Sequence, residues 1–339
     1  MSPTFSLILG DAIRTKLPDK SVDLVIGSPP YEIQRLYSVL KFALKGQAWV
    51  DWMVAGFKEW LRICRGPVIM VIEGFTEDFA YSATPFLLGA DLHRAGITLR
   101  KAPIYHRVGI PGSGGPDWLR NDYEFYIVAT NGGRLPFSDP TVMGHLPKYG
   151  PGGAMSHRLA NGSRRNQWGG TPTATGMQGR RRNGKHKKNG RPAERYMTIT
   201  RDRPGQHAQT TPYTPPKLAN PGNVISEKYT AAQVAAMAQF IIESGDVTKH
   251  IVGGGVMGHP LAHENEAPFP ETLPDFFIRS FCPPGGTVFD PFCGSGSTGA
   301  AALKAGRNFI GIDARFSQIK IATRRLREVS AALQAEVAK

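Results

Sequence analysis

The sequence predicts a soluble α/β protein built on a mostly parallel sheet with helices on both faces. The chain has 339 residues, 41% of them are hydrophobic, and short apolar runs alternate with longer amphipathic segments. At roughly 100 to 200 residues per domain, this length allows about two domains, each with a core of its own. The aliphatic and aromatic content excludes a disordered or collagen-like chain.

The N-terminal part alternates between strand-like and helix-like segments. The expected strands are Ser6–Leu9, Val22–Ile26, Val68–Ile72, Ile97–Tyr105 and Phe125–Ala129. The expected helices are Tyr37–Leu44, Trp49–Cys64 and Phe86–Arg94. Strands that alternate with helices are typical of crossover connections, which produce a parallel sheet.

The last third of the chain repeats this alternation. Thr287–Asp290 and Asn308–Asp313 are expected strands, with a helix at Thr298–Ala305 between them and a final amphipathic helix at Phe316–Val337. The two parts of the chain thus share one pattern of alternating strands and helices.

The region 134–250 between these halves differs in composition and charge. It contains 18 Lys and Arg against 6 Asp and Glu, a net +12, so nearly all of the chain's +14 lies there. Residues 135–222 are rich in Gly, Pro, Asn and Arg with little periodicity, and Ala231–Ser244 is a weak helix. We expect a separate irregular module, partly disordered without its ligand. Its excess charge favours a polyanionic partner, although a solvated loop fits as well.

The cysteines and the N-terminus bear on the compartment. Cys64, Cys282 and Cys293 are too few and too scattered for a disulfide framework or a Cys-x-x-Cys zinc site, so a reducing cytosol is expected and no metal is implied. The sequence shows neither a signal peptide nor an apolar run of about 18 residues, which predicts no membrane association.

A glycine-rich motif is the most informative feature of the C-terminal part. In Val288-Phe-Asp-Pro-Phe-Cys-Gly-Ser-Gly-Ser-Thr-Gly299 an expected strand turns through glycines into a helix. Glycines let the backbone approach a ligand, and a helix N-terminus offers free N–H groups to an anion. Asp313 ends the next expected strand, and its carboxylate is able to accept hydrogen bonds from two ribose hydroxyls. The Gly-x-Gly-x-x-Gly spacing by itself also suits a nicotinamide oxidoreductase.

A second motif, Ser28-Pro-Pro-Tyr31, follows the expected strand at Val22–Ile26. Proline continues neither a helix nor a central strand, so Pro29 and Pro30 fix the backbone at the end of that strand. The Ser28 hydroxyl and the Pro29 carbonyl are acceptors for an amino group, and the Tyr31 ring offers a face for stacking. A simple loop breaker is the alternative interpretation.

Together the two motifs resemble the amino-group DNA methyltransferases, which combine a Ser/Asp/Asn-Pro-Pro-aromatic motif with an S-adenosylmethionine site of the Asp-Pro-Phe-x-Gly-Ser-Gly type. The order of motifs resembles the family's β class. The resemblance covers roughly residues 6–130 and 255–330 and includes Gly10-Asp11, Asn121–Val128 and Glu264–Pro274. It implies one domain with a Rossmann-like sheet, in which residues 1–133 form the catalytic half and residues 251–339 the cofactor-binding half. The region 134–250 is the implied target-recognition module. Ala267-Pro268 departs from a frequent Lys-Pro in the family, so a charge contact there is not implied.

The resemblance also implies roles for individual residues. Those around S-adenosylmethionine are Asp11 at the adenine, Asp313 at the ribose, and Asp290, Phe292, Gly294, Ser295 and Gly296 at the methionine part. Ser28, Pro29, Pro30 and Tyr31 are the implied catalytic residues, and they hold a base that has left the duplex.

Further candidates for DNA contact lie outside the two motifs. Trp118 and Arg120, in a glycine-rich loop, are candidates for wedging into or clamping DNA, and Tyr123 for a second wall around the base. The basic run supplies the candidate phosphate contacts Arg180, Arg181, Arg182, Lys185, Lys187 and Lys188.

The expected activity is site-specific methyl transfer from S-adenosylmethionine to N4 of cytosine in double-stranded DNA. Ser at the first motif position is commoner in the family's cytosine enzymes, and N6 of adenine is the alternative. A catalytically inactive nucleic-acid-binding protein is an alternative of another class. The resemblance implies a cytoplasmic enzyme of the bacterial or phage-encoded type and allows for a cognate restriction endonuclease as a partner. The oligomeric state and the recognition sequence do not follow from the sequence.

Overall fold

The computed structural model describes residues 2–32, 44–106, 119, 121–145, 218–226, 261 and 270–337. Contacts divide the chain into two compact units, Met1–Met143 with Pro221–Lys339, and Gly144–Asn220. In the second unit, His145 and Ala219 exchange backbone hydrogen bonds of 3.2 and 2.8 Å. The expected helix Ala231–Ser244 lies outside the described residues, as does Tyr37–Leu44 except for Leu44.

The first unit contains a nine-stranded sheet in the order β1-β11-β10-β2-β3-β8-β7-β9, with β6 also on β8. The strands are β1 (Phe5–Leu9), β2 (Leu24–Gly27), β3 (Val68–Ile72), β6 (Thr98–Leu99), β7 (Ile104–His106), β8 (Tyr123–Thr130), β9 (Val224–Ser226), β10 (Thr287–Asp290) and β11 (Asn308–Asp313). Within this sheet β8 alone runs against the others, since its pairs with β3, β6 and β7 are all antiparallel. The expected mostly parallel sheet is confirmed.

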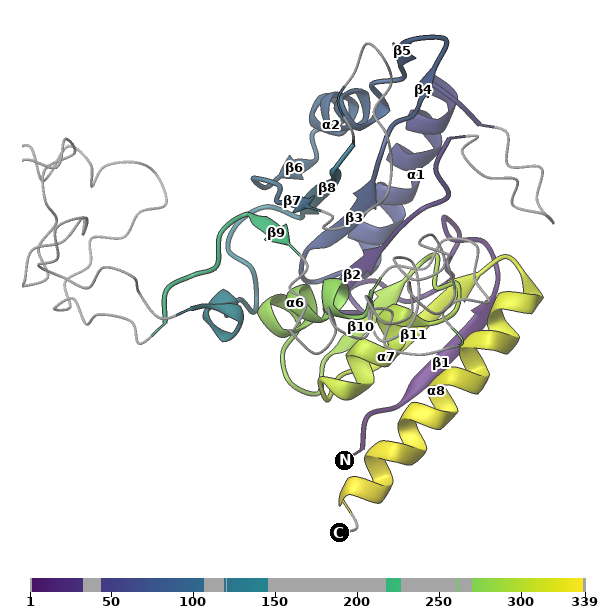
Figure 1. The fold of residues 1–339 in the computed structure, drawn as a ribbon, viewed down its shortest axis with the longest axis vertical. Helices are drawn as coiled ribbons and strands as arrows, with labels where there is room; N and C mark the ends of the chain where they lie inside the picture. The colour runs from purple at the N-terminus through teal and green to yellow at the C-terminus, as the bar shows by residue number, and fades with distance from the viewer. Residues whose placement is uncertain are drawn as a thin grey trace, which may run out of the picture. The chain divides into compact units, whose positions relative to one another are not determined.

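Helices cover both faces of this sheet (Figure 1). The helices are α1 (Gln47–Ile63), α2 (Thr84–Arg94), α6 (Thr272–Phe281), α7 (Ser297–Lys304) and α8 (Phe316–Val337). One buried cluster joins α1 and α2 to the sheet, and a second joins α6, α7 and α8 to it. Leu24 and Ile26 of β2 belong to the second cluster and Val25 to the first, as the twofold period of a strand requires.

The single strand expected at Ile97–Tyr105 is wrong. The segment Ile97–Tyr105 forms two short strands, β6 and β7, on the same partner β8. Leu99 pairs with Ala129 and Ile104 with Phe125, so five steps along one chain match four along the other. The additional residue is a bulge, which Pro103 favours because it has no N–H for the ladder.

Several elements had no clear signal in the sequence. These are the β4–β5 hairpin (Thr76–Glu77 with Ala80–Tyr81), strand β9, the 3-10 helix η1 (Pro140–Met143) and helix α6. β9 pairs in parallel with β7, and the Asp139 N–H donates to the Ser280 carbonyl of α6 at 2.8 Å. Residues 139–143 and 224–226, inside the expected middle region, thus belong to the first unit.

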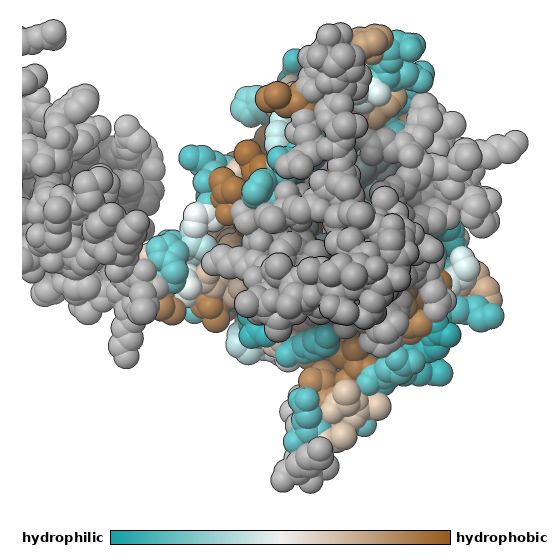
Figure 2. Space-filling view, in the orientation of Figure 1, coloured by the Kyte–Doolittle hydropathy of each residue, from teal (hydrophilic) through white to brown (hydrophobic). Residues whose placement is uncertain are grey.

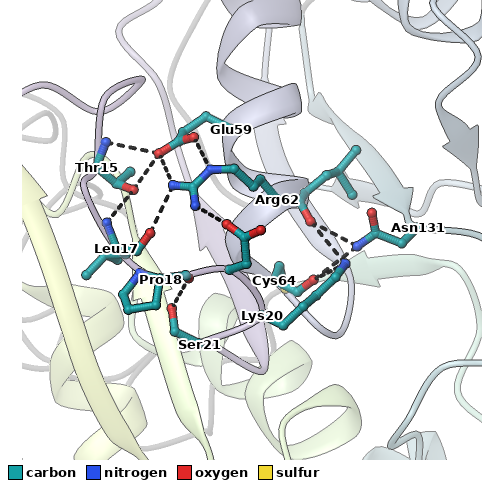
Figure 3. A network of polar contacts seen from close by, with 11 residues as sticks. Thr15, Leu17, Pro18, Lys20, Ser21, Glu59, Arg62, Cys64 and Asn131 are labelled. Carbon is teal, nitrogen blue, oxygen red and sulfur yellow. Dashed lines mark hydrogen bonds and ion pairs between the residues drawn. The ribbon is translucent and has the colours of Figure 1, made fainter.

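A polar network holds the C-terminal end of α1 (Figure 3). Lys20 and Asn131 each donate to the carbonyls of Leu61 and Cys64, at 3.0 to 3.4 Å. Helix termini leave such carbonyls without intrahelical partners. In the same network Glu59 accepts hydrogen bonds from the backbone and hydroxyl of Thr15, which follows β1. The end of α1 is thereby fixed to the loop that leaves β1.

Gly27 at the end of β2 has no room for a side chain. A Cβ atom there would lie 2.5 Å from Oδ1 of the buried Asp290, which a 2.9 Å bond from the Phe292 N–H holds in place. We expect Gly27→Ala to lower the free energy of unfolding by about 1–3 kcal/mol in urea denaturation. Gly222→Ala is the matched control, since nothing lies within 4 Å of its Cβ position. Equal midpoints for Gly27→Ala and the wild type would contradict the prediction.

Candidate active site

The two sequence motifs meet at one edge of the sheet. Ser28 and Asp290 lie 262 positions apart, yet β2 and β10 are parallel neighbours with Leu24 opposite Val288. Parallel strands end at the same edge, so the segments that follow them leave side by side. Gly27 lies against the Asp290 carboxylate, which places the Ser-Pro-Pro-Tyr segment directly beside the glycine turn.

A directed chain of hydrogen bonds runs through the first motif. The Ser28 hydroxyl donates to the Tyr31 hydroxyl at 3.3 Å, and Tyr31 donates to Oε2 of Glu124 at 3.1 Å. Burial, followed by the negative charge of Glu124, raises the pKa of Tyr31 well above its usual value. The phenol therefore stays protonated and keeps its hydrogen bond to Glu124. The sequence motifs did not identify Glu124 as a residue of the site.

Glu32, the next residue, is a buried carboxylate that the sequence analysis also missed. It is 1% exposed, and its Oε2 accepts a 2.6 Å bond from the Thr84 hydroxyl at the start of α2. Its Oε1 accepts the Gly46 N–H at the start of α1. Helix N-termini favour negative charge, so Glu32 ties the end of the motif to two helices. An acidic residue after a Pro-Pro-Tyr segment reads from sequence as a surface residue, so no signal identified it.

The glycine turn surrounds a second buried carboxylate. Asp290 is 1% exposed and accepts bonds from the Phe292 N–H at 2.9 Å and the Thr298 hydroxyl at 2.6 Å. Burial raises its pKa to about 7, although both hydrogen bonds act in the opposite direction. Gly294 and Gly296 have φ angles of 47° and 85°, in the left-handed region that glycine adopts readily. The turn thus needs these two glycines.

Asp313 and Asp11 lie at the ends of the next two strands. Asp313 is 8% exposed and accepts bonds from the Gly294 N–H at 3.1 Å and the Arg315 N–H at 2.9 Å, with the Arg315 side chain 3.3 Å away. The Gly10 N–H donates to the Asp313 carbonyl at 3.1 Å, so the loop after β1 begins beside it. The exposed Asp11 carboxylate accepts a bond from the Ile13 N–H at 3.0 Å.

Tryptophans of α1 hold three of the segments that form the site. Trp49 donates to the Pro30 carbonyl at 2.9 Å, and Trp60 donates to the Ala12 carbonyl at 2.8 Å. The ring of Phe292 lies 5.7 Å from that of Trp52 and 5.6 Å from that of Trp60. One helix therefore contacts the loop after β1, the Ser-Pro-Pro-Tyr segment and the glycine turn.

Arg325 of α8 supports the glycine turn from behind. Its side chain is fully buried and pairs with Glu271 at 2.6 Å. It also donates to the carbonyl of Ser295 at 3.3 Å and the hydroxyl of Ser297 at 3.1 Å. A buried charge is tolerated only when it is paired and hydrogen-bonded, so this network fixes the turn. From the sequence alone, Arg325 could not be told apart from the other arginines of this amphipathic helix.

On the other side of the first motif, Tyr123 begins β8 and is 44% exposed. Its neighbour Glu124 belongs to the Ser28–Tyr31 chain, so Tyr123 lies next to the motif along β8. The remaining candidates for DNA contact lie outside the described residues. They are Trp118, Arg120, Arg180, Arg181, Arg182, Lys185, Lys187 and Lys188.

The described ranges contain no group of three or more His, Cys, Asp or Glu residues that is able to hold a metal ion. All three cysteines are buried and free, and burial raises the pKa of Cys293 well above its usual value. The Cys293 thiol is therefore protonated at neutral pH and is a poor nucleophile. Within the described part of the chain, no helix is both long enough and apolar enough to span a bilayer.

Comparisons with known proteins find related DNA methyltransferases. The family model described as DNA methylase, of the N6 and N4 type, matches residues 22–324. The DNA adenine methyltransferase YhdJ of Escherichia coli K12 is 24% identical over 337 residues, which are 98% of this chain and 86% of that protein. The type II methyltransferase M.HinfI of Haemophilus influenzae is 44% identical over 68 residues, 20% of this chain and 18% of that protein.

A solved structure shares the fold. The PvuII DNA methyltransferase, described as cytosine-N4-specific, superimposes with a TM-score of 0.55 at 16% identity and covers 98% of this chain and 93% of its own. The family model, in turn, spans most of this sequence, including both motifs. The chain therefore belongs to the N6/N4 DNA methylase family of S-adenosylmethionine-dependent amino-group methyltransferases.

Proposed function

We propose that the chain methylates N4 of cytosine in a base that has turned out of double-stranded DNA. The observation that carries this is the contact of Gly27 with Asp290, which brings the Ser28–Tyr31 segment and the glycine turn to one edge. A base held at the first and a methyl donor held at the second would lie next to each other. Ser28 in the first position supports cytosine as the target.

N6 of adenine is the second candidate. YhdJ, which aligns with 98% of this chain, is described as an adenine methyltransferase. Both bases present an amino group conjugated with a ring. The Ser28 hydroxyl and the Pro29 carbonyl are able to accept hydrogen bonds from either amino group.

The residues of the glycine turn fit S-adenosylmethionine. Gly294 and Gly296 adopt the left-handed φ angles that the turn requires, and Asp313 and Asp11 stand at the ends of adjoining strands, where a ribose and an adenine would bind. When bound, the cofactor supplies an electrophilic methyl group on a positively charged sulfonium. A cation near Asp290 would favour the ionised form of that buried carboxylate.

The protein's own contribution is positioning. The Ser28 proton is engaged with Tyr31, so the lone pairs of its oxygen remain to accept a bond from a base amino group, together with the Pro29 carbonyl. Such acceptors orient the amino nitrogen toward a methyl group. Orientation of this kind lowers barriers by about 7–11 kcal/mol in model reactions. The Tyr31 ring, held by Glu124, supplies the stacking face.

No covalent enzyme intermediate enters this proposal. The cofactor would supply its methyl group to the amino nitrogen without a protein nucleophile, and that nitrogen would then release a proton. The described cysteines are buried with raised pKa values. The basic region 134–250 would hold the phosphates of the distorted duplex. The proposed location of the enzyme is the cytoplasm. A cognate restriction endonuclease stays a prediction.

The product of the reaction tests the proposed target. Purified enzyme methylates unmethylated DNA of mixed sequence, the DNA is digested to nucleosides, and the products are identified by mass spectrometry. We expect N4-methylcytosine. N6-methyladenine would instead support adenine as the target. DNA binding without any methylated nucleoside would indicate a catalytically inactive DNA-binding protein.

Variants of the two motifs should separate catalysis from cofactor binding. We expect Ser28→Ala to lower kcat about 100-fold, the size of effect seen when one well-placed polar group is removed, while cofactor affinity is kept. Tyr31→Ala should behave alike, because the stacking face is lost. Asp313→Ala is the matched contrast, with weaker cofactor binding in calorimetry. Full turnover by Ser28→Ala would remove Ser28 from the mechanism.

The raised pKa of Asp290 predicts a pH dependence of stability. The folded pKa of about 7 exceeds the value of about 3.9 in an unfolded chain, so the unfolded state binds fewer protons between these values. The free energy of unfolding therefore falls as pH rises through this window. Between pH 5 and 7.5 we expect Asp290 to contribute a fall of about 2 kcal/mol that is absent in Asp290→Asn. Urea denaturation without cofactor measures it, and identical changes in both proteins would contradict it.

A further inference from the structure

The β4–β5 hairpin follows β3 and presents an aromatic residue at its tip. Its turn consists of Asp78 and Phe79, with φ angles of 47° and 62°. Two-residue turns of this kind favour Asn or Gly, and a bulky residue with positive φ is an outlier. Phe79 is nevertheless found there and is 72% exposed. Backbone strain of this kind gathers at functional positions.

The hairpin is fixed at its base to the target side of the site. The Tyr81 hydroxyl donates to Oε1 of Glu73 at 2.9 Å, and the Ser82 N–H donates to the Phe75 carbonyl at 2.8 Å. A Cβ on Gly74 would lie 2.7 Å from the Tyr81 ring, so glycine there lets the ring pack. The negative charge of Glu73 also contributes to the raised pKa of Tyr31. Ile72 of β3 lies opposite Phe125 of β8, so Glu73 at the base of the hairpin comes across from Glu124, the hydrogen-bond partner of Tyr31.

Aromatic rings continue from the hairpin to Tyr123. Ring centroids are 6.4 Å apart for Tyr81 and Phe86, 5.1 Å for Phe86 and Phe125, and 5.2 Å for Phe125 and Tyr123. Tyr81, Phe86 and Tyr123 are 41%, 59% and 44% exposed. In Figure 1 the hairpin stands at the top of the ribbon, where Figure 2 shows a small hydrophobic area next to hydrophilic surface. Exposed rings in series are typical of surfaces on which bases stack.

The charges near the tip do not suit a phosphate. Asp78 lies in the turn, and Glu77 lies 3.9 Å from Lys45 in an exposed ion pair. Carboxylates repel the DNA backbone, whereas a flat apolar ring enters the neutral stack of bases. Proteins that open or kink a duplex insert Phe, Leu, Ile or Met between base steps. The tip thus has the chemistry of a residue that contacts bases.

We propose that the β4–β5 hairpin is a wedge, with Phe79 entering the base stack beside the target pair and holding the duplex open while the target base occupies the site. This rests on the proposed function, since it assumes a base that leaves the duplex. The partner is double-stranded DNA. The ring occupies the space beside the extruded base, so it opposes return of that base to the stack.

The test measures unwinding of DNA, which does not require methyl transfer. Nicked circular plasmid is saturated with protein, sealed by ligase, stripped of protein, and its topoisomers are separated on a gel. A ring inserted between base pairs unwinds the duplex, so the wild type should shift the distribution. We expect Phe79→Gly to reduce the shift at least threefold at equal occupancy by filter binding. Glycine suits φ 62°, so this variant should unfold at the same temperature as the wild type or higher.

Two further variants complete the design. Val142→Ala removes another exposed apolar side chain, in η1, and should shift topoisomers as the wild type does. Phe79→Trp retains a flat ring and should restore the shift. No shift with the wild type, or an equal shift with Phe79→Gly, would overturn the wedge.

Methyl transfer separates the wedge from the proposed function. Methylation is followed by transfer of tritium from labelled S-adenosylmethionine to DNA. Heat-denatured DNA needs no opening, so Phe79→Gly should methylate it at a rate within twofold of the wild type. On duplex DNA the rate of the same variant should fall at least tenfold. Equal loss on both substrates would contradict the wedge. A wild type that shifts topoisomers but transfers no label to any DNA would instead refute the proposed function and leave the wedge standing.

Discussion

The site depends on the insertion of β10 between β2 and β11 in parallel register. This pairing places the ends of strands from opposite parts of the chain at one edge and brings Gly27 onto the Asp290 carboxylate. The contact leaves no space for a methyl group. The distance between the two motifs is therefore set by backbone pairing, which is stiffer than any arrangement of flexible loops.

Helix α1 adds a second constraint. The indole N–H groups of Trp49 and Trp60 donate hydrogen bonds to the carbonyls of Pro30 and Ala12. The rings of Trp52 and Trp60 pack on Phe292. A Cβ on Gly56 would lie 2.7 Å from the Trp60 ring, so glycine in the helix permits this packing. Glycine weakens a helix interior, and here the packing of a large indole offsets that effect. The loops of the site are thus held by a rigid element.

Buried, hydrogen-bonded acidic and basic side chains carry much of the local order. Glu32, Asp290, Asp313 and Arg325 are all buried and hydrogen-bonded, and each fixes a turn or helix end at the site. Buried polar groups hold fixed positions because leaving one without a hydrogen-bond partner is unfavourable. This pre-formed polarity suits a reaction between a cationic donor and an oriented amino group, where most of the catalysis is positioning.

The sequence by itself determined whatever depends on neighbours along the chain. Short apolar runs located β3, β10 and β11 at their observed bounds, helical periodicity located α8, and glycine and proline chemistry located both motifs. The bulge between β6 and β7 was missed because pairing with β8 creates it. Glu32, Glu124, Trp49 and Arg325 looked like ordinary surface or core residues, since their partners are distant in sequence. Only the tertiary structure decided their roles, because a hydrogen bond or a buried charge is defined by what lies across from it in space.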